Sequence, residues 1–362
     1  MKADRRKLPP MRTSDFDYHL PQDLIAQTPI EPRDASRLLV LDRGSGRLQH
    51  KHFHQIVEYL LAGDVMVFNQ SRVIPARLRG RRTDTGGKVE FLLLKRESPG
   101  VWQALARPGR RLKAGATVTL EQAGQIRVEP TPATFDVEVL DSGQDGIKTI
   151  RLFNEDDINR FGVMPLPPYI HDRLEDPERY QTVYARQPGS AAAPTAGLHF
   201  TQELLDSLAS HGVESTFLTL HVGLDTFRPV QEEDPSQHRI HTEYYELNQE
   251  TADVLNRARS EGRRVIAVGT TSVRVLEHTA QEIERQGREQ LAQCQGQADL
   301  FIVPGHRFRM VDAMVTNFHL PRSTLLMLVS AFANRETLLG TYQVAIRERY
   351  RFYSFGDAML IL

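Results

Sequence analysis

The sequence predicts an α/β protein whose main domain resembles an α/β barrel and is interrupted by a small antiparallel β-barrel. Two patterns along the chain support this. Residues 66–153 have the pattern of short strands separated by turn residues. After Asp156, strand and helix patterns alternate. A length of 362 residues suggests two domains, or at most three. We expect a discontinuous α/β domain at 13–70 and 157–362, with the inserted barrel at 71–156.

The inserted domain is predicted from short alternating segments bounded by Gly and Pro. Gly86 and Gly87 form the turn of a first hairpin. The expected strands are 77–82, 88–94, 101–106, 117–120, 125–128, 135–140 and 147–153.

The main domain begins with helical signals near Pro21 and then the apolar strand 64–68. Residues 1–12 are basic and are expected to form a flexible extension. Beyond residue 190, helices are expected at 201–211, 251–260, 272–286 and 323–334. Strands are expected at 216–222, 265–268 and 301–303, followed by a hydrophobic strand after Asp357.

Composition excludes several classes of protein. The formal net charge is −1, so a uniformly basic nucleic-acid coat is excluded. Cys294 is the single cysteine, so neither an intramolecular disulfide nor a Cys-based zinc site can form. The longest apolar stretch, 325–333, is too short to span a bilayer, and the basic N-terminus has no apolar signal-peptide segment. A cytoplasmic protein without membrane contact is expected.

Positive charge is concentrated in the predicted barrel. Between Arg72 and Lys113 there are twelve Lys or Arg residues and three acidic residues, a local balance of +9. This suits a phosphate backbone, and Trp102 in the same window could stack on a base. The alternative is a solvated strand face with Trp102 in the barrel core.

Three segments place polar residues where an α/β fold presents a ligand. Residues 190–201 are rich in small residues and contain Thr195 and His199. His221 follows a predicted strand, just before a glycine turn. The strand 265–268 leads directly into a predicted helix through four residues whose backbone N–H groups and hydroxyls suit a carboxylate, a phosphate or ribose hydroxyls. Candidate ligand contacts in that third segment are Gly269, Thr270, Thr271 and Arg274.

Two further segments lie near the C-terminus. Asn317, His319 and Arg322 fall within six positions, just before a predicted buried helix. Asp357 belongs to a Gly-Asp turn preceded by aromatic residues at 350–355, which could stack on a base or pack in the core. Each of the five segments also has an ordinary structural interpretation.

Two groups of histidines could act as metal ligands. His50, His52 and His54 share a strand face, but no nearby carboxylate completes a set, so no metal is expected. His238 and His241 lie near Glu243, and we regard Glu243 as a possible base or ribose contact instead.

Taken together, these segments resemble the S-adenosylmethionine:tRNA ribosyltransferase-isomerase family of queuosine synthesis. The resemblance runs from Asp15 to the C-terminus. Long uncommon strings occur in the family's order, among them Phe68-Asn-Gln-Ser-Arg-Val-Ile-Pro-Ala-Arg, Ala193-Pro-Thr-Ala-Gly-Leu-His-Phe-Thr, Val268-Gly-Thr-Thr-Ser-Val-Arg and Thr316-Asn-Phe-His-Leu-Pro. Two departures are Ala191, in place of a usual valine, and Asp225, in place of a usual glycine in the loop after His221.

The resemblance implies an enzyme acting on tRNA of GUN anticodon whose wobble base is 7-aminomethyl-7-deazaguanine (preQ1). The ribosyl group of S-adenosylmethionine is transferred and isomerised onto the aminomethyl nitrogen, giving epoxyqueuosine-tRNA, adenine and methionine. An α/β domain with an inserted β-barrel and a monomeric enzyme without a metal are also implied. Residues expected to contact tRNA are Arg72, Arg77, Arg79, Arg81, Arg82 and Lys88.

This chemistry requires a base for a C5′ hydrogen beside the sulfonium, a proton donor for adenine, and contacts for the carboxylate and ribose. Histidine can serve the first two needs. The predicted catalytic residues are His199, His221, His319, Glu243 and Asp357. The predicted cosubstrate contacts are Thr195, Gly269, Thr270, Thr271, Arg274 and Asn317. A non-catalytic RNA-binding factor and a small-molecule α/β isomerase or hydrolase remain the alternatives.

Overall fold

The computed structural model describes residues 11–121, 136–143, 146–155, 158–172, 174–223, 230–238, 240 and 242–362. They form two compact units. The main unit comprises Met1–Asn69, Thr195–Leu218 and Asp225–Leu362, and the barrel unit comprises Gln70–Pro194 and Thr219–Leu224. The insert expected from the sequence ended at residue 156, whereas the barrel unit continues to Pro194 and includes residues 219–224. The predicted strand 125–128, His241 and Asp225 lie outside the described residues, as does most of the predicted N-terminal extension.

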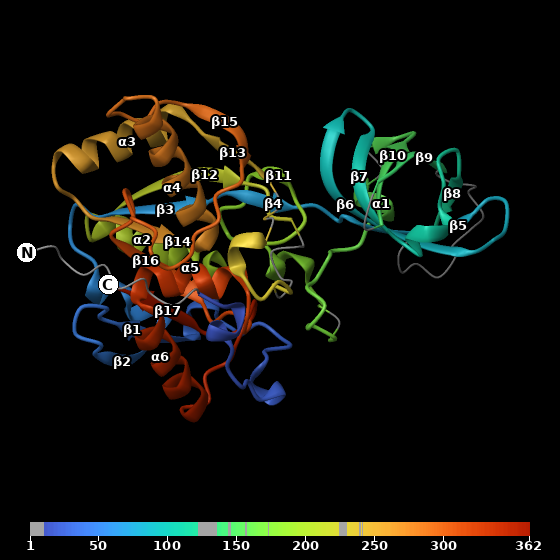
Figure 1. Cartoon of the computed structure of the whole chain (residues 1–362). Coiled ribbons are helices and arrows are strands. Elements are labelled where there is room, and N and C mark those ends of the chain that lie inside the picture. The colour runs from blue at the N-terminus through green and yellow to red at the C-terminus, as the bar shows by residue number, and fades with distance from the viewer. Residues whose placement is uncertain are drawn as a thin grey trace, which may run out of the picture. The chain divides into compact units, whose positions relative to one another are not determined.

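The main unit is organised around one nine-stranded sheet (Figure 1). The strand order is β15 (Cys294–Ala298), β13 (Glu243–Leu247), β12 (Glu214–Leu220), β3 (Val65–Asn69), β14 (Val265–Val268), β16 (Ala313–Asn317), β17 (Ala358–Ile361), β1 (Arg37–Leu41) and β2 (Leu48–His52). The central strands β3, β14, β16, and β17 consist almost wholly of buried residues, as a sheet covered on both faces requires. The sheet is open, with β15 and β2 at its edges, where the sequence had suggested barrel-like closure.

Five helices of eight residues or more accompany the sheet in the described part of the main unit. They are α2 (Gln202–Ser210), α3 (Gln249–Ser260), α4 (Thr270–Arg285), α5 (Thr324–Ala333) and α6 (Arg335–Arg347). The side chains of Thr201, Asn248, Ser323 and Asn334 accept a backbone N–H at the starts of α2, α3, α5 and α6. The start of α4 has no such side-chain cap, because Gly269 occupies the cap position.

Short 3₁₀ turns connect these elements. In the main unit they are η1 (Thr13–Phe16), η2 (Gln22–Leu24), η3 (Arg33–Ala35), η4 (Phe53–Tyr59), η8 (Thr195–His199) and η10 (Pro235–Gln237). In the barrel unit they are η5 (Gly109–Arg111) and η7 (Pro177–Tyr180). The predicted helical signal near Pro21 corresponds to η2.

The barrel unit contains a closed six-stranded antiparallel barrel (Figure 1). Its strands, in order around the barrel, are β10 (Ile147–Leu152), β7 (Val101–Arg107), β6 (Lys88–Ser98), β5 (Arg77–Arg82), β8 (Thr117–Leu120) and β9 (Asp136–Ser142). The short helix α1 (Ile158–Phe161) packs beside it, and β4 (Ser71–Val73) pairs with β11 (Gln187–Ser190). The predicted α/β class with a small antiparallel barrel is therefore confirmed.

Alternating side chains fill the barrel and explain why its strands could be predicted. Leu78, Phe91, Val118 and Ile150 are all fully buried in one cluster. Trp102 belongs to the same cluster, and its indole N–H donates to Glu155 Oε1 at 2.6 Å. Of the two interpretations of Trp102, base stacking and a place in the barrel core, the structure confirms the second. Its side of β7 faces the barrel core.

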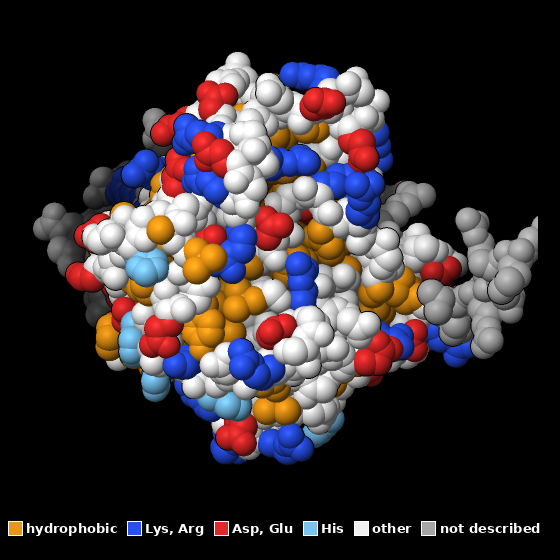
Figure 2. Space-filling model, turned by 90° about the vertical axis from the view of Figure 1, so that its left-hand side faces the viewer, with side chains coloured by type: hydrophobic (Ala, Val, Ile, Leu, Met, Phe, Trp, Pro, Cys, Tyr) orange, Lys and Arg blue, Asp and Glu red, His pale blue; other side chains and the backbone are white. Residues whose placement is uncertain are grey.

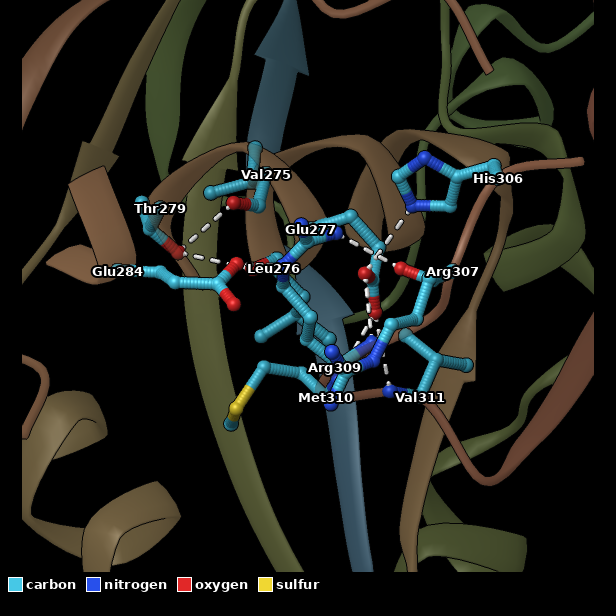
Figure 3. A network of polar contacts seen from close by, with 10 residues as sticks. All are labelled: Val275, Leu276, Glu277, Thr279, Glu284, His306, Arg307, Arg309, Met310 and Val311. Atoms are coloured by element: carbon cyan, nitrogen blue, oxygen red, sulfur yellow. Dashed lines mark hydrogen bonds and ion pairs between the residues drawn. The ribbon is translucent and has the colours of Figure 1, made fainter. Parts of the chain in front are cut away.

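A buried carboxylate ties α4 to the segment that leads into β16 (Figure 3). Glu277 is fully buried and accepts backbone N–H groups from Arg309 at 2.8 Å, Met310 at 2.9 Å and Val311 at 3.2 Å. His306 Nε2 lies 3.2 Å from the same carboxylate. Glu284, on the same helix, is half exposed and accepts from Arg309 Nε at 2.6 Å. Glu277 thereby fixes where β16 begins.

Several element predictions differ from the structure. Residues 301–303 were expected to be a strand, but they form no strand, although Ile302 is buried. The edge of the sheet is formed instead by β15, a polar segment that alternation of apolar residues could not reveal. The helix α6 was also not predicted. Among the described residues, no helix is both long enough and apolar enough to cross a membrane.

Candidate active site at one edge of the main sheet

Strand directions bring several predicted residues to one edge of the main sheet. Strands β3, β14 and β16 are parallel, so Asn69, Gly269 and Asn317 lie at neighbouring carboxyl ends. Strand β17 runs antiparallel to β16 and parallel to β1, so the amino ends of β17 and β1 reach the same edge. Asp357 and Ser36 immediately precede those two ends. In open α/β sheets, ligands bind at this carboxyl edge.

At this edge, Asn317 is the centre of a buried chain of hydrogen bonds. Its Nδ2 lies 3.1 Å from His199 Nε2 and also donates to the carbonyl of Tyr353 at 3.3 Å. Its Oδ1 accepts from Thr195 Oγ1 at 2.9 Å. On the far side of the imidazole, His199 Nδ1 lies 2.7 Å from Ser36 Oγ. The predicted residues Thr195, His199 and Asn317 therefore form one network, which Ser36 completes.

The environment of His199 keeps its imidazole neutral. The side chain is 4% exposed and its ring stacks on Phe53 with centroids 4.9 Å apart. Burial, together with the smaller effect of the positive charges of Arg351 and Arg33, lowers the pKa of His199 to about 3. Because Asn317 Nδ2 can only donate, the network assigns the ring proton to Nδ1, facing Ser36.

The start of α4 adjoins this network through Gly269. Its φ of +86° favours glycine, and its N–H donates to the carbonyl of Val315 at 2.8 Å. A Cβ built on Gly269 would lie 3.6 Å from the Cβ of Ala196, in the same turn as Thr195 and His199. Thr270 and Thr271 are both buried, and the hydroxyl of Thr271 has no hydrogen-bond partner among the described residues.

His319 lies close in sequence to Asn317 but is built into the core. Its Nε2 lies 2.8 Å from Thr316 Oγ1, and its backbone N–H donates to the hydroxyl of Tyr342 at 3.0 Å. The hydroxyl of Tyr18 donates to its carbonyl. Burial lowers the pKa of His319 to about 3. These bonds hold the loop after β16, and thus the backbone that carries Asn317.

His221 belongs to the barrel unit, so it is described apart from the network of the main unit. Val222, the next residue, donates its N–H to Ser190 Oγ at 2.9 Å and accepts the N–H of Ala191 at 3.0 Å. Gly189 has a φ of +141°, and a Cβ there would come within 2.7 Å of His221 Nε2. Burial lowers the pKa of His221 to about 4. The imidazole is thus held neutral against a glycine that leaves room for it.

Three other predicted site residues have structural partners. Glu243 and Arg274 form a buried ion pair with each other, and Arg274 also donates to the carbonyls of Ala298 and Leu300, both at 3.4 Å. Asp357 accepts the backbone N–H of Arg37 at 2.9 Å and of Arg351 at 2.8 Å. Burial raises the pKa of Asp357. These contacts join strands and turns, so a ligand would compete with existing partners at all three.

The aromatic residues before Asp357 also belong to the core. Tyr350, Phe352 and Tyr353 are buried, and the ring of Phe352 lies 4.8 Å from that of Phe318. Base stacking by these rings, one of the two interpretations of the sequence, therefore does not fit the structure.

Most of the predicted tRNA-binding residues carry acidic partners on the surface of the barrel unit. Arg72 pairs with Glu178 at 2.5 Å, Arg79 with Glu90 at 3.2 Å, Arg81 with Glu121 at 2.6 Å, and Arg82 with Asp84. Arg77 is half-buried and donates to the carbonyl of Leu166 at 3.4 Å, whereas Lys88 is exposed. Glu121 and Glu178 come from outside the +9 window, so part of that charge is offset on the surface.

Acidic and basic side chains are also interspersed elsewhere. Figure 2 shows one face of the molecule on which blue and red side chains alternate around smaller hydrophobic areas. The charged side chains on that face do not form a continuous positive surface along which a polyanion could bind.

No metal site emerges from the residues that the structure describes. Among them, no group of three or more His, Cys, Asp or Glu side chains is placed to hold an ion. His50 Nδ1 instead lies 2.8 Å from the hydroxyl of Tyr350, and the rings of His52 and His54 stack 5.8 Å apart.

Sequence reasoning missed Ser36, Phe53 and the two arginines that face His199. Ser36 has no motif around it, and it reaches His199 only because β1 pairs in parallel with β17. Phe53 is an apolar residue in a 3₁₀ turn. No local pattern could have revealed either contact.

Comparison with known proteins identifies the family of the chain. The chain matches the queuosine biosynthesis protein family over residues 13–361. It is 53% identical, over 352 residues, to the S-adenosylmethionine:tRNA ribosyltransferase-isomerase of Dehalococcoides mccartyi, with 97% of this chain and all of the relative covered. The protein of the same name from Symbiobacterium thermophilum is also 53% identical, over 354 residues and with the same coverage.

A solved structure is similar as well. The crystal structure of S-adenosylmethionine tRNA ribosyltransferase from Thermotoga maritima matches with a TM-score of 0.55 and 39% identity, covering 96% of this chain and all of that one. The chain is therefore an enzyme of the transferase and isomerase class. It belongs to the queuosine biosynthesis protein family, which confirms the resemblance seen in its motifs.

Proposed function

We propose that this enzyme transfers and isomerises the ribosyl group of S-adenosylmethionine onto the aminomethyl nitrogen of preQ1 in tRNA, giving epoxyqueuosine-tRNA. The observation that carries the proposal is identity of 53% across 97% of the chain to relatives named S-adenosylmethionine:tRNA ribosyltransferase-isomerase. The buried network of Thr195, His199, Asn317 and Ser36, at the edge where α/β sheets bind ligands, supports it. A cytoplasmic monomer acting on GUN tRNA without a metal stays a prediction.

The reaction begins with loss of a C5′ hydrogen beside the sulfonium, because the positive sulfur stabilises the carbanion. Adenine departure, attack by the amine, and epoxide closure with loss of methionine then follow. We assign the main-unit network the task of holding the cosubstrate's sugar. A neutral His199, bonded on both nitrogens, suits alignment of Asn317 and Thr195 better than free proton exchange. His221 and His319 remain candidates for proton transfer and for positioning.

Product analysis tests the proposed reaction. Purified enzyme is incubated with S-adenosylmethionine, labelled in the adenine ring, and with preQ1-containing tRNA. We expect adenine and methionine to be released in equal amounts, only when both substrates are present. A non-catalytic RNA-binding factor would release none. A small-molecule isomerase would act on the free preQ1 base as readily as on tRNA. Either result would overturn the proposal.

Single substitutions test the proposed roles of the histidines. His199→Ala, His221→Ala and His319→Ala should each lower turnover, with His54→Ala as a control for loss of an exposed imidazole. If all three kept full turnover and unchanged cosubstrate binding, the histidine assignment would be wrong.

The barrel unit is the proposed tRNA contact. Arg79, Arg81 and Arg82 each pair with a partly or fully exposed acid, which a phosphate can replace. Charge reversal at these three positions should weaken tRNA binding strongly and leave S-adenosylmethionine binding unchanged. A filter-binding titration showing unaltered tRNA affinity would remove these residues from the interface.

A further inference from the structure

The start of α4 carries a polar group without a partner. Thr271 is more than nine-tenths buried, yet its Oγ1 has no hydrogen-bond partner among the described residues. A Cβ built on Gly269 would lie 3.4 Å from this oxygen, so the hydroxyl stands over the first turn of the helix. Native proteins rarely leave a buried hydroxyl unpaired, and such a group calls for an explanation. A bound ligand supplies one.

The same helix end also lacks a side-chain cap. The first N–H groups of an α-helix have no acceptor within the helix. At α2, α3, α5 and α6 a Thr, Asn or Ser side chain accepts one of them, whereas Gly269 has no side chain to do so. These N–H groups and the Thr271 hydroxyl are all donors that lie together. They match an acceptor with two oxygens.

The charge at this position favours a carboxylate over a phosphate. The helix end contributes a fraction of a positive charge. The nearest cation on α4, Arg274, is already neutralised by Glu243. A singly charged group therefore fits better than a doubly charged one. Of the charged groups of S-adenosylmethionine, the sulfonium and the ammonium would be repelled by this end, and the carboxylate alone would be attracted.

We infer that the first turn of α4 and the Thr271 hydroxyl bind the methionyl carboxylate of S-adenosylmethionine. This inference rests on the proposed function and adds an orientation to it. The carboxylate lies at Gly269–Thr271, and Ala196, next to Thr195, lies against Gly269. The adenosyl part is therefore directed along the sheet edge toward Thr195, His199 and Asn317. Thr271 is a binding residue in this arrangement, and Arg274 is not.

The test compares two ligands that differ by one carboxylate. Equilibrium dialysis measures Kd of the full chain for S-adenosylmethionine, for decarboxylated S-adenosylmethionine and for 5′-methylthioadenosine. The variants are Thr271→Val, which removes the hydroxyl at nearly constant volume, and Thr271→Ser, which retains it. We expect Thr271→Val to weaken S-adenosylmethionine binding about tenfold and to change binding of the decarboxylated ligand less than twofold. Thr271→Ser should stay within about threefold of the parent for both.

The outcomes separate this inference from the proposed function. Equal weakening of both ligands by Thr271→Val, or no weakening of either, would overturn the carboxylate assignment while the parent enzyme still bound S-adenosylmethionine. Failure of the parent enzyme to bind that ligand at all would count against the proposed function itself. Unchanged 5′-methylthioadenosine binding by both variants shows that the site remains folded. If Thr271→Val does not fold, Thr271→Ala, which also removes the hydroxyl, is compared in its place: weakening of the carboxylated ligand alone supports the inference, and equal or no weakening of the two ligands overturns it.

Discussion

Polar residues serve opposite purposes in the two units. At the edge of the main sheet, Asn317, His199 and Ser36 are buried and satisfy one another. On the barrel, Arg79 and Arg81 are at least half exposed and pair with acids at the surface. A buried group that loses its partner keeps the cost of desolvation, whereas an exposed one is rehydrated. The main unit therefore uses polar groups to fix geometry, and the barrel keeps charges that can change partners.

The largest expected effect is at Glu277, because Glu277→Gln replaces one of the two acceptor oxygens with an NH2 donor and leaves at least one buried backbone N–H of residues 309–311 without an acceptor. Glu277→Gln should lower the free energy of unfolding by about 3 kcal/mol. Glu284→Gln is a matched control on the same helix, since Glu284 is exposed and contacts the same segment, and it should change stability by little more than experimental error. Urea denaturation of both variants measures the change in the free energy of unfolding. Similar losses of unfolding free energy in Glu277→Gln and Glu284→Gln would contradict the distinction between buried and exposed carboxylates.

Asn317→Ala should have the next largest effect. It removes one acceptor from Thr195 and the donor to His199, so we expect a loss of about 2 kcal/mol in the free energy of unfolding. Displacement of the network should also lower turnover by about 100-fold, with tRNA affinity unchanged. Denaturation, single-turnover kinetics and filter binding give the three readouts. Unchanged turnover would show that the network only supports the fold.

The pH dependence of stability tests the buried histidines. His199 has a folded pKa of about 3 against an ordinary value of 6.5, so the unfolded chain takes up its proton first as pH falls. The contribution of neutral His199 to the free energy of unfolding is fully present above pH 6.5. It is lost progressively as the pH falls from 6.5 to about 3. His199→Gln should therefore reduce the slope of unfolding free energy with pH by up to about 1.4 kcal/mol per pH unit. Denaturation at pH 7, 6 and 5, with His54→Gln as the matched control, measures it. An unchanged slope in His199→Gln would contradict the pKa assigned to His199.

The smallest effect on stability is expected on the barrel. Arg81→Gln should change the free energy of unfolding by no more than about 0.5 kcal/mol, because its pair with Glu121 is exposed. The same substitution should weaken tRNA binding and reduce the salt slope by about one unit. Thermal denaturation and tRNA binding at several salt concentrations test both. A large loss of stability would show that the surface pairs hold the barrel together.

The sequence predicted those elements that depend on the local pattern of apolar, polar and turn residues. The buried run 265–268, ended by Gly269, predicted β14 and the start of α4, and alternation predicted most barrel strands. Contacts and edge strands that depend on which strands pair could not be predicted. Arg274 appeared as a ligand contact and is bound to Glu243 on β13, a partner 31 positions away. The apolar residues 301–303 resemble a strand by composition, yet polar β15 pairs with β13 instead. Ser36 reaches His199 only through the parallel register of β1 with β17.

Strand β17 has a consequence for how the protein is made. It lies between β16 and β1, pairing with both. During translation, the hairpin of β1 and β2 emerges from the ribosome roughly three hundred residues before the strand that joins it to the rest of the sheet. Until residues 358–361 emerge, the nascent chain exposes unpaired strand edges on both sides of the gap, and such edges invite association with other chains. Emergence of β17 is therefore the event that lets this edge of the sheet form, with Ser36 and Asn317 brought together last.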